Sequence, residues 1–469
     1  MLKKNAEYIN TVAYLGANGE GILKEEGVVV FVPFVLVGEK IRYKILKVTS
    51  KCAYGKVLEV LTPAEERVRP KCSVYGKCGG CQLQHLNYTS QLHTKENNVA
   101  TCFKKIANLD VQVHSAIRCS NEYGYRNKLQ LPVADGGDQI VIGFYAENSH
   151  RVIPITDCPI NPYWTKTIIE CFTEYAKEFD IKGYNDITFT GELREITVKE
   201  IKDNLIITAV VTDERIRGID YLIKILTQKL NLTFSLFLNI NTSRSNVVYG
   251  ERFILKHGKP FYMSELRGVK YKIGVQSFMQ VNNEMCGKLY SAVVENVGAD
   301  EDTTVIDAYS GAGLMTAMLA KTANKAIGVE IIKEATECAN ELVELNGLEN
   351  KMVNYNGKCE ELLPTIIKEE KQKGKKITLV VDPPRKGIDQ SLINVIRDSQ
   401  IDKVVYVSCM PSTLARDVGL ICGSLTVVGN EVKKATDPTL LYDVTLVRPY
   451  DMFPQTKHVE TLVCLARKV

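Results

Sequence analysis

The sequence predicts an α/β fold for the C-terminal part of the chain, preceded by a small all-β barrel and a mixed α+β region. Residues 266–469 alternate short apolar strands with helical stretches, whereas residues 1–62 contain only strand signals separated by glycine-rich breaks. The length of 469 residues also exceeds that of one ordinary hydrophobic core. We therefore expect three domains, which span residues 1–62, 63–265 and 266–469.

The first domain has the pattern of a small barrel of about five strands. Its strand signals are NTVAYLG, GVVVFVPFVLVGEKIRYKILKVT and AYGKVLEVL, with the break GANGEGI (16–22) between them. The first 60 residues contain nine Lys and Arg against six Asp and Glu, interleaved with Tyr and Phe. Small basic barrels often bind RNA, but a solvated barrel surface would carry similar charge, so charge alone leaves both interpretations open.

The second domain mixes the two kinds of secondary structure. TPAEERVRPKC (62–72) has the composition of a linker, and a helix is expected over residues 163–178. Strand-like segments are expected at 128–133, 139–145, 194–199 and 204–211. This part of the chain has no repeat of fixed period.

The third domain has the alternation that is typical of a mostly parallel sheet covered by helices on both faces. Its strand signals are TTVIDAYSGAGLM, KAIGVE, ITLVVDPPRKG, KVVYVSC and VETLVCLARKV, and KEATECANELVELNG is one of its helical stretches. In such open sheets, ligands bind outside the carboxyl ends of the strands. Functional residues are therefore expected where these strands end.

A glycine loop follows the first of these strands. Gly311 and Gly313 permit a tight turn and a close approach of the backbone to a ligand. Glu330 ends the next strand, nineteen residues after Gly311, where a carboxylate can accept both ribose hydroxyls. The third glycine of the dinucleotide fingerprint and a phosphate-binding Lys are both missing from the loop. The pattern therefore favours S-adenosylmethionine over NAD or ATP.

Two further residues lie at the ends of strands. Asp382 in VVDPPR (380–385) precedes a rigid Pro-Pro turn, and Cys409 in VVYVSCMPST (404–413) stands where a strand ends before Pro411. Asp382 could serve a ligand or could be a structural carboxylate beside Arg385. A thiol at the exit of a central strand could be packing filler or could reach a substrate at this edge.

Four cysteines have the spacing of a metal site. CSVYGKCGGC has the pattern C-x5-C-x2-C, and a fourth cysteine lies in TDCPI; these residues are Cys72, Cys78, Cys81 and Cys158. Three thiols within ten residues, with two glycines between two of them, are hard to explain by packing. All-thiolate ligation indicates zinc or an iron–sulfur cluster. The following Pro159 and the single C-x2-C arm favour iron–sulfur, with zinc as the alternative.

Bulk composition indicates a cytoplasmic protein. Hydrophobic residues make up 45% and charged residues 24% of the chain, and the net charge of +4 permits a nucleic-acid partner without requiring one. The N-terminal MLKKNAEYIN has no apolar core segment, and the longest apolar run, VVVFVPFVLV (28–37), is too short to span a bilayer. The fourteen cysteines are therefore expected to be reduced.

Several motifs together resemble the RNA uracil-5-methyltransferases. They are SCMPST, DPPRKG, DAYSGAG, SFMQVN (277–282) and DMFPQTKHVE (451–460). The cysteine pattern, and an N-terminal barrel that resembles a TRAM domain, are similar to the branch that acts on 23S ribosomal RNA and carries a [4Fe–4S] cluster, which the tRNA branch lacks. YRNK (125–128) and GFYAENSHRVIPITDCPI (143–160) also resemble that branch, so the resemblance covers nearly the whole chain.

The resemblance implies a role for each matching residue. Cys409 matches the nucleophile, and Glu460 matches the general base. The residues that match contacts to S-adenosylmethionine are Gln280, Tyr309, Glu330 and Asp382, and those that match the cluster ligands are Cys72, Cys78, Cys81 and Cys158. The resemblance also implies a Rossmann-like methyltransferase domain, an OB-like TRAM barrel, and 23S ribosomal RNA as the partner of a monomeric enzyme.

The sequence departs from the family pattern at two places. Leu314 follows the Gly-x-Gly, where the ribosomal enzymes often have Asn, so one polar cofactor contact is missing. Lys358 and Cys359 occupy the place of an expected acidic residue, and no adenine contact is assigned there.

The implied chemistry needs a thiolate and a base. Addition of the Cys409 thiolate to C6 of uracil turns C5 into a nucleophilic carbon, and Glu460 can then remove the C5 proton. His458 would share the face of Glu460 if both lay on one strand, and it could compete as the base. A structural hydrogen bond is the preferred role for His458 because the family base matches Glu460.

Three rival functions remain for comparison. RNA 5-methylcytosine transferases typically carry a Cys in a D-x-P-C turn, and this chain has DPPR there, which argues against them. A tRNA uracil-5-methyltransferase is the alternative within the family. A non-catalytic RNA-binding or assembly factor on the same scaffold would not need Cys409, Glu460 and the glycine loop together.

Overall fold

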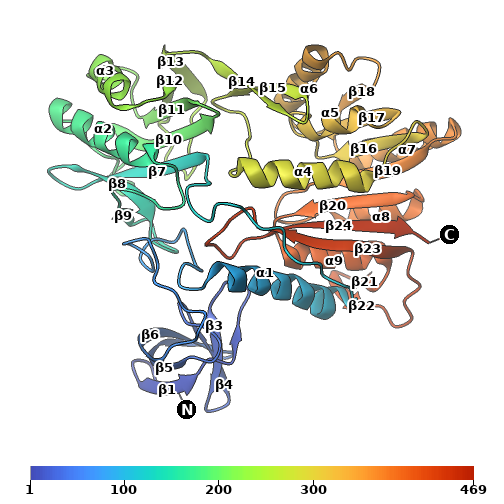
Figure 1. The fold of residues 1–469 in the computed structure, drawn as a ribbon, viewed down its shortest axis with the longest axis horizontal. Helices are drawn as coiled ribbons and strands as arrows, with labels where there is room; N and C mark the ends of the chain where they lie inside the picture. Colours follow the sequence, from blue (N-terminus) through green and yellow to red (C-terminus); the bar gives the residue numbers. More distant parts are fainter. Residues whose placement is uncertain (1, 469) are drawn as a thin grey trace.

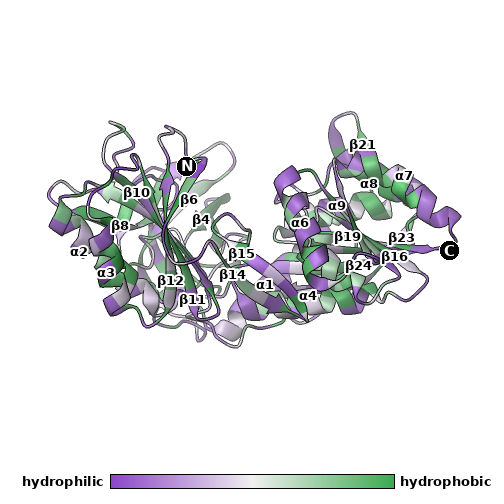
Figure 2. Ribbon diagram, turned by 90° about the horizontal axis from the view of Figure 1, so that it is seen from above, coloured by the Kyte–Doolittle hydropathy of each residue, from purple (hydrophilic) through white to green (hydrophobic). Residues whose placement is uncertain are grey.

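The structure is a computed structural model that describes residues 2–468, and three large sheets organise it (Figure 1). Met1 and Val469, the outer ends of the first and third predicted domains, lie outside the described residues. In Figure 1 the N-terminal sheet lies at the bottom, the central sheet at the upper left and the C-terminal sheet on the right, and in Figure 2 the first two lie on the left and the third on the right. Within the described chain, no helix has the length and apolar character that crossing a membrane requires.

The N-terminal sheet confirms the expected β-rich domain. Its strands are β1 (Glu7–Thr11), β2 (Tyr14–Leu15), β3 (Gly21–Glu25), β4 (Val28–Val32), β5 (Lys40–Val48) and β6 (Ala53–Thr62), in the order β1-β5-β6-β4-β3-β2. β1 and β2 are successive pieces of one extended segment, yet they stand at opposite ends of this order. The sheet therefore closes on itself as a barrel, and alternate residues such as Ile41, Tyr43 and Ile45 fill its interior.

The central sheet carries two helices on one face. Its order is β13-β12-β11-β10-β7-β8-β9. The strands are β7 (Lys128–Asp135), β8 (Ile140–Tyr145), β9 (Val152–Pro154), β10 (Leu193–Ile201), β11 (Asn204–Val211), β12 (Thr233–Ile240) and β13 (Arg252–His257). α2 (Trp164–Phe179) and α3 (Ile219–Lys229) bury Trp164, Phe172 and Leu226 against this sheet. β7, β8, β10, β11 and α2 confirm the elements that the sequence predicts here.

The C-terminal sheet has the order β18-β17-β16-β19-β20-β24-β23. The strands are β16 (Thr303–Ala308), β17 (Lys325–Glu330), β18 (Met352–Asn356), β19 (Lys376–Val381), β20 (Lys403–Ser408), β23 (Tyr442–Tyr450) and β24 (Glu460–Arg467). The first five in this order run parallel, whereas β24 is antiparallel to both β20 and β23. The expectation of a mostly parallel α/β sheet is confirmed.

Helices cover both faces of this sheet and create two cores. α4 (Asn283–Val297), α5 (Leu314–Ala320) and α6 (Lys333–Asn346) pack on one face. α7 (Cys359–Gln372), α8 (Gln390–Asp398) and α9 (Pro411–Cys422) pack on the other. Successive strand residues such as Val305 and Ile306 belong to opposite cores, as a strand buried on both faces requires. The helices show hydrophobic and hydrophilic sides in Figure 2.

Two segments connect the domains. Helix α1 (Tyr88–Cys102) and the π-helical turn η1 (Phe103–Ala107) lie in the range predicted for the central domain, but Val99 and Phe103 pack in the core of the C-terminal sheet (Figure 1). The hairpin of β14 (Phe261–Leu266) and β15 (Val269–Gly274) packs Tyr262 with the central domain and Val269 with the C-terminal one. The boundaries at residues 62 and 265 stay predictions.

Candidate active site

The glycine loop turns sharply after β16. Tyr309, Gly311 and Gly313 all have positive φ angles, of 66°, 53° and 81°. A side chain at Gly313 would collide with Ala339 and Met352, so glycine is required there by packing. A Cβ on Gly311 would meet no atom within 4 Å, so the backbone of Gly311 faces open space. This open side of the loop is where a ligand can approach the backbone.

Glu330 holds the glycine loop at the end of β17. The backbone N–H of Gly311 donates to Glu330 Oε2 at 2.9 Å, and the N–H of Ile332 donates to Oε1 at 2.9 Å. Each carboxylate oxygen has a second lone pair and can accept a further hydrogen bond. Glu330 can therefore support the loop and also accept hydroxyl groups of a bound ribose.

Asp382 stands next in the row of strand ends. The parallel register joins Ala308 of β16 to Val381 of β19, so Tyr309 and Asp382 follow at neighbouring positions. The side chain of Asp382 is exposed, yet the surrounding protein desolvates it and raises the pKa of its carboxyl to about 7. The two roles that the sequence left open for Asp382, a ligand contact and a structural carboxylate beside Arg385, both stay predictions. Asp382 forms no ion pair with any of residues 2–468, so its carboxyl can meet a ligand at this edge.

A second carboxyl lies beneath the same row. Asp307 is buried at the end of β16, and Thr316 donates a hydrogen bond of 2.6 Å to its Oδ2. Burial raises the pKa of Asp307 to about 7, and the nearby Asp382 and Glu330 raise it further. Asp307 lies within the motif VIDAYSGAG, but its position there did not by itself indicate a role.

Gln280 is held at the site from the other side, just before α4. The Asn127 side chain donates to the Gln280 carbonyl at 2.9 Å and to Asn283 Oδ1 at 2.6 Å. The side chain of Gln280 hydrogen-bonds Tyr290, whose pKa is raised by burial and by charges that include Asp382. The YRNK and SFMQVN motifs, 150 residues apart, therefore meet beside the strand ends, and Tyr290 joins them.

Cys409 and Glu460 lie just beyond the last pair of the β20–β24 ladder, close enough for the charge of Glu460 to raise the pKa of the Cys409 thiol. The ladder between β20 and β24 runs to the pair Ser408↔Thr461, so the next positions along it are Cys409 and Glu460. The two side chains that the sequence singles out thus come together although they are about fifty residues apart in the chain.

Burial and nearby charges shift the pKa values of both Cys409 and Glu460. Burial raises the pKa of Glu460 to about 8, Asp382 raises it further, and Arg385 lowers it. Burial also raises the pKa of the Cys409 thiol, Glu460 adds to this, and Arg385 lowers it through its charge and a hydrogen bond to the thiol. Arg385 is therefore the cation that favours the thiolate, a role that DPPR did not reveal by itself.

His458 does not share a strand with Glu460. β24 begins at Glu460, and His458 lies in the preceding loop, half-buried beside Phe453. Burial lowers the pKa of His458 to about 4, and the positive charge of Arg385 lowers it further. The condition under which His458 would share the face of Glu460 is therefore not met, because β24 starts only at Glu460.

The four cysteines of the predicted cluster lie near one another. Burial raises the pKa of Cys81 to about 11 and that of Cys158 to about 12, and the neighbouring thiols raise both further. Among residues 2–468, however, no group of three or more His, Cys, Asp or Glu side chains has the spacing to hold a metal ion. The metal site therefore stays a prediction.

Leu314 and Cys359, two residues that depart from the family pattern, each stand at the first position of a helix. Leu314 is the first residue of α5, and its side chain is half-buried in the core that lies on the α4–α6 face of the sheet. Cys359 opens α7 and is 5% exposed, packed in the opposite core. Neither residue offers a polar group to the open side of the glycine loop.

Comparison with known proteins assigns the family. The family described as tRNA (Uracil-5-)-methyltransferase matches residues 87–468. An "uncharacterized RNA methyltransferase" of Clostridium acetobutylicum is 39% identical over 99% of this chain and 98% of its own length. A protein of the same description from Listeria innocua is 36% identical over 100% of this chain and 99% of its own length.

A solved structure has the same architecture. The crystal structure of Pyrococcus abyssi tRNA (uracil-54, C5)-methyltransferase in complex with S-adenosyl-L-homocysteine aligns with a TM-score of 0.74 and 26% sequence identity. The alignment covers 98% of this chain and 99% of that one, so it includes the barrel and both larger domains. The chain belongs to the tRNA (uracil-5-)-methyltransferase family and is an S-adenosylmethionine-dependent RNA methyltransferase.

Proposed function

We propose that this enzyme methylates C5 of a uridine in 23S ribosomal RNA, with Cys409 as the nucleophile and Glu460 as the general base. The observation that carries the mechanism is that both residues adjoin the last pair of the β20–β24 ladder, Ser408 and Thr461, and that Glu460 acts on the pKa of the Cys409 thiol. A thiolate and a carboxylate on adjacent strands can reach the same uracil ring. The thiolate can then act on C6 while the carboxylate acts on the proton at C5.

The residues of the site divide the reaction into steps. The Cys409 thiolate forms a bond to C6 of the uracil, and the electron pair of the C5–C6 double bond moves toward C5 and O4. S-adenosylmethionine supplies the electrophilic methyl group that C5 takes. Glu460 then removes the C5 proton, the double bond forms again, and the bond between Cys409 Sγ and C6 breaks. Arg385 stabilises the Cys409 thiolate before the first step, and it stabilises the thiolate again when the last step releases it.

The strand-end residues fit the methyl donor. Gly311 leaves open space beside the backbone, and both oxygens of Glu330 can accept ribose hydroxyls. Asp382, Tyr309 and Gln280 surround the same edge and complete the set that we assign to donor binding. Their carboxylates suit a ligand with hydroxyl donors and a positive sulfonium, and they would repel a pyrophosphate.

The choice of RNA has two candidates. The cysteine pattern and the basic barrel, which resembles a TRAM domain, support 23S ribosomal RNA. The Pyrococcus abyssi neighbour acts on tRNA, which supports tRNA as the second candidate. In both cases the target uracil must leave its stack to reach Cys409. Mapping 5-methyluridine in ribosomal RNA and tRNA from a strain that lacks the gene distinguishes them, because only the true substrate loses the modification.

We also propose that Cys72, Cys78, Cys81 and Cys158 hold a [4Fe–4S] cluster. The donor set is chemically suited to iron–sulfur, and Gly79 and Gly80 leave the Cys72–Cys81 loop free to close around it. The chain just after this loop contacts the segment before Glu460, because the Leu83 N–H donates to the Gln455 carbonyl at 3.0 Å. Anaerobically purified protein should contain iron and sulfide, and Cys78→Ser should lose both. Stoichiometric zinc without iron would contradict the cluster.

A covalent trap tests the mechanism. RNA that contains 5-fluorouracil keeps fluorine at C5, where no base can remove it, so the adduct with Cys409 should persist on a denaturing gel. Cys409→Ala should bind S-adenosylhomocysteine normally and form no adduct. An adduct that still forms with Cys409→Ala would exclude this residue as the nucleophile, and failure of the wild-type protein to form any adduct would point to a non-catalytic RNA-binding factor.

A further inference from the structure

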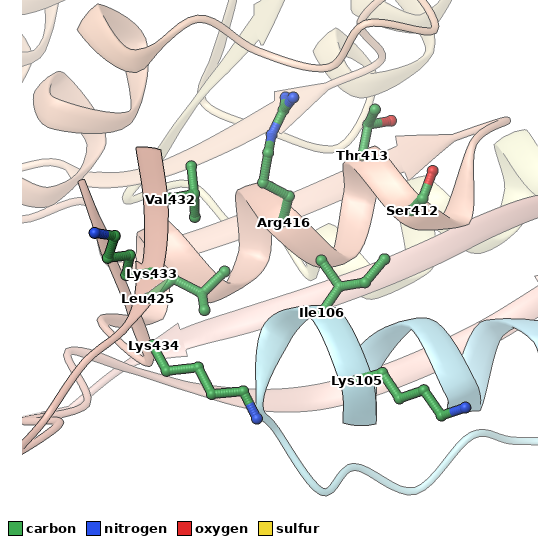
Figure 3. A pocket seen from close by; sticks show the side chains of 9 residues that line it. All are labelled: Lys105, Ile106, Ser412, Thr413, Arg416, Leu425, Val432, Lys433 and Lys434. Atoms are coloured by element: carbon green, nitrogen blue, oxygen red, sulfur yellow. The ribbon is translucent and has the colours of Figure 1, made fainter. Parts of the chain in front are cut away.

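A pocket of about 490 Å³ lies outside the site described above, between helix α9, the turn η1 and the hairpin of β21 (Leu425–Val428) and β22 (Glu431–Lys434) (Figure 3). Nine residues line it, and none of them is acidic. Four are cations: Lys105, Arg416, Lys433 and Lys434. Apolar side chains form part of the wall and can support the methylene stems of the lysines.

Two of the four cations have acidic partners and two are available. Arg416 pairs with its neighbour Asp417 and also donates to the Lys386 carbonyl at 2.9 Å. Lys433 pairs with Glu431 at 3.1 Å, and both side chains are exposed. Lys105 and Lys434 are exposed and form no ion pair with any side chain that the structure describes. The charge of the pocket is thus not neutralised from within the chain.

The pocket adjoins the catalytic segment. Ser412 and Thr413, on the first turn of α9, line it only three and four residues after Cys409. The Thr413 hydroxyl donates to the Arg385 carbonyl at 3.1 Å, and the Arg385 side chain hydrogen-bonds the Cys409 thiol. One end of the basic surface therefore lies on the first turn of α9, which follows Cys409 in the chain, and the other reaches the β21–β22 hairpin and η1 (Figure 3).

We infer that this pocket docks the phosphate backbone of the substrate RNA beside the target uridine. The inference rests on the proposed function, because it assumes that RNA brings a uridine to Cys409. Lysine ammonium groups bind phosphates as point charges, whereas base recognition by stacking needs aromatic side chains, and the pocket has none. The contact therefore contributes affinity and register, while sequence recognition lies elsewhere.

The test removes the two available charges. The double variant Lys105→Gln, Lys434→Gln should bind labelled transcripts of 23S ribosomal RNA and tRNA more weakly than the wild-type protein. Each lost phosphate contact makes the slope of log K against log salt shallower by about 0.7–0.9, so two contacts change it by about 1.4–1.8. The ratio of wild-type to variant affinity should therefore fall about sevenfold to twelvefold between 50 and 200 mM salt.

Matched variants separate charge from other effects. Lys105→Arg with Lys434→Arg keeps both charges and should keep the wild-type slope. Lys177→Gln with Lys224→Gln removes two exposed lysines from α2 and α3 of the central domain and should leave affinity unchanged. Binding of S-adenosylhomocysteine should be the same in all of these proteins, because none of the four lysines belongs to the set of residues proposed to bind the methyl donor.

The outcomes distinguish this inference from the proposed function. If the wild-type protein traps 5-fluorouracil RNA and the Gln double variant has wild-type affinity and salt slope, the docking role is wrong and the mechanism stands. If the Gln variant loses binding of inorganic phosphate only, the pocket is a small-anion site and the RNA assignment is overturned. If the wild-type protein traps no RNA but the salt slopes differ as expected, the docking role stands without the methylation chemistry.

Discussion

The buried ammonium of Lys95 lies 2.5 Å from Oδ1 of Asp451, and this pair joins α1 to the segment that leads into Glu460. Lys95 also donates to the Phe453 carbonyl at 3.1 Å. Two side-chain amides lie alongside: Gln91 donates to Gln455 Oε1 at 3.0 Å and accepts from the Gln455 backbone N–H at 3.0 Å. Helix α1 therefore positions the loop that delivers the proposed base, which explains why it packs on the C-terminal sheet.

Lys95→Met should destabilise the protein, because it leaves the Asp451 carboxylate buried without its cation. Loss of one partner of a buried pair costs about 3–5 kcal/mol of unfolding free energy. Urea unfolding measures this. The double variant Lys95→Met, Asp451→Asn removes both charges and should recover most of the loss. A double variant as unstable as Lys95→Met would show that packing of the lysine stem, and not the charge pair, stabilises this contact.

Glu460→Gln should methylate the RNA once and then stall. The amide cannot take the C5 proton, so the methylated base stays bonded to Cys409. A denaturing gel with ordinary labelled RNA should show a persistent protein–RNA band that carries label from the methyl donor. Cys409→Ala with Glu460→Gln is the control and should show no band. A Glu460→Gln enzyme that turns over normally would assign the base to another group.

The pH profile should report the charge of Glu460. Since burial raises its pKa to about 8, kcat/KM should rise with pH until the carboxyl is ionised near that value. Arg385 lowers the pKa of both Glu460 and Cys409, so Arg385→Gln should move the rising limb to higher pH. Arg385→Lys keeps a positive charge, so the rise of kcat/KM should occur at a pH closer to that of the wild-type enzyme. An unmoved limb in Arg385→Gln would argue against this electrostatic role.

Stability should depend on pH through the same carboxyl. The folded-state pKa of Glu460, about 8, lies above its ordinary value of 4.5, so the folded protein binds the proton more tightly than the unfolded chain does. The resulting stabilisation is complete below pH 4.5 and is lost as the pH rises through about 8. Glu460→Gln should therefore gain stability relative to the wild type between pH 5 and pH 9, by about 5 kcal/mol at most. Urea unfolding at both pH values checks this, and a constant difference would contradict it.

Lys199 of β10 holds the segment that precedes Gln280, a residue for which we propose a contact to the methyl donor. Its buried ammonium donates to the carbonyls of Gly274, Val275 and Ser277, at 3.2, 2.6 and 2.5 Å, just before Gln280. Lys199→Met should raise KM for S-adenosylmethionine about tenfold or more, since hydrogen bonds from a charged group contribute about 1.5–3 kcal/mol. The kcat value should change less, because no reacting group is lost.

Calorimetry of S-adenosylhomocysteine binding checks the effect of Lys199→Met. Lys128 lies opposite Lys199 on β7, so Lys128→Met is a matched control that should keep donor affinity. An equal loss in both variants would indicate a general effect on the central sheet. Trapping of 5-fluorouracil RNA at saturating donor should survive in Lys199→Met, which separates positioning from catalysis.

Local sequence patterns were sufficient to predict the helices, strands and turns that depend on short-range features of the chain. The period of apolar residues predicted β10, β11 and α2, and the glycines after an apolar strand predicted the sharp turn at Gly311 and Gly313, where the φ angles are positive. The ends of β17, β19 and β20 placed Glu330, Asp382 and Cys409 at one edge because parallel strands share their carboxyl ends.

The sequence did not predict how distant segments pair. Helix α1 presents polar residues such as Gln91 and Lys95 to the core, so its apolar periodicity is weak, and its partners lie about 360 residues away. The place of His458 outside β24 could not be read from the sequence for a related reason. Where β24 begins depends on its pairing with β20 and β23, and a strand boundary set by two partners leaves little trace in one segment.

The sequence by itself determined the α/β class, the glycine loop, the carboxylates at the strand ends and the identity of the thiol, because each depends on residue type and short-range periodicity. Only the tertiary structure decided that β24 runs antiparallel between β20 and β23, which brings Glu460 close to Cys409. It also decided that Arg385 turns to the thiol and that α1 joins the C-terminal core. These relations depend on contacts between segments far apart in the chain, and their free energy comes from burial and charge that exist only once the strands have paired.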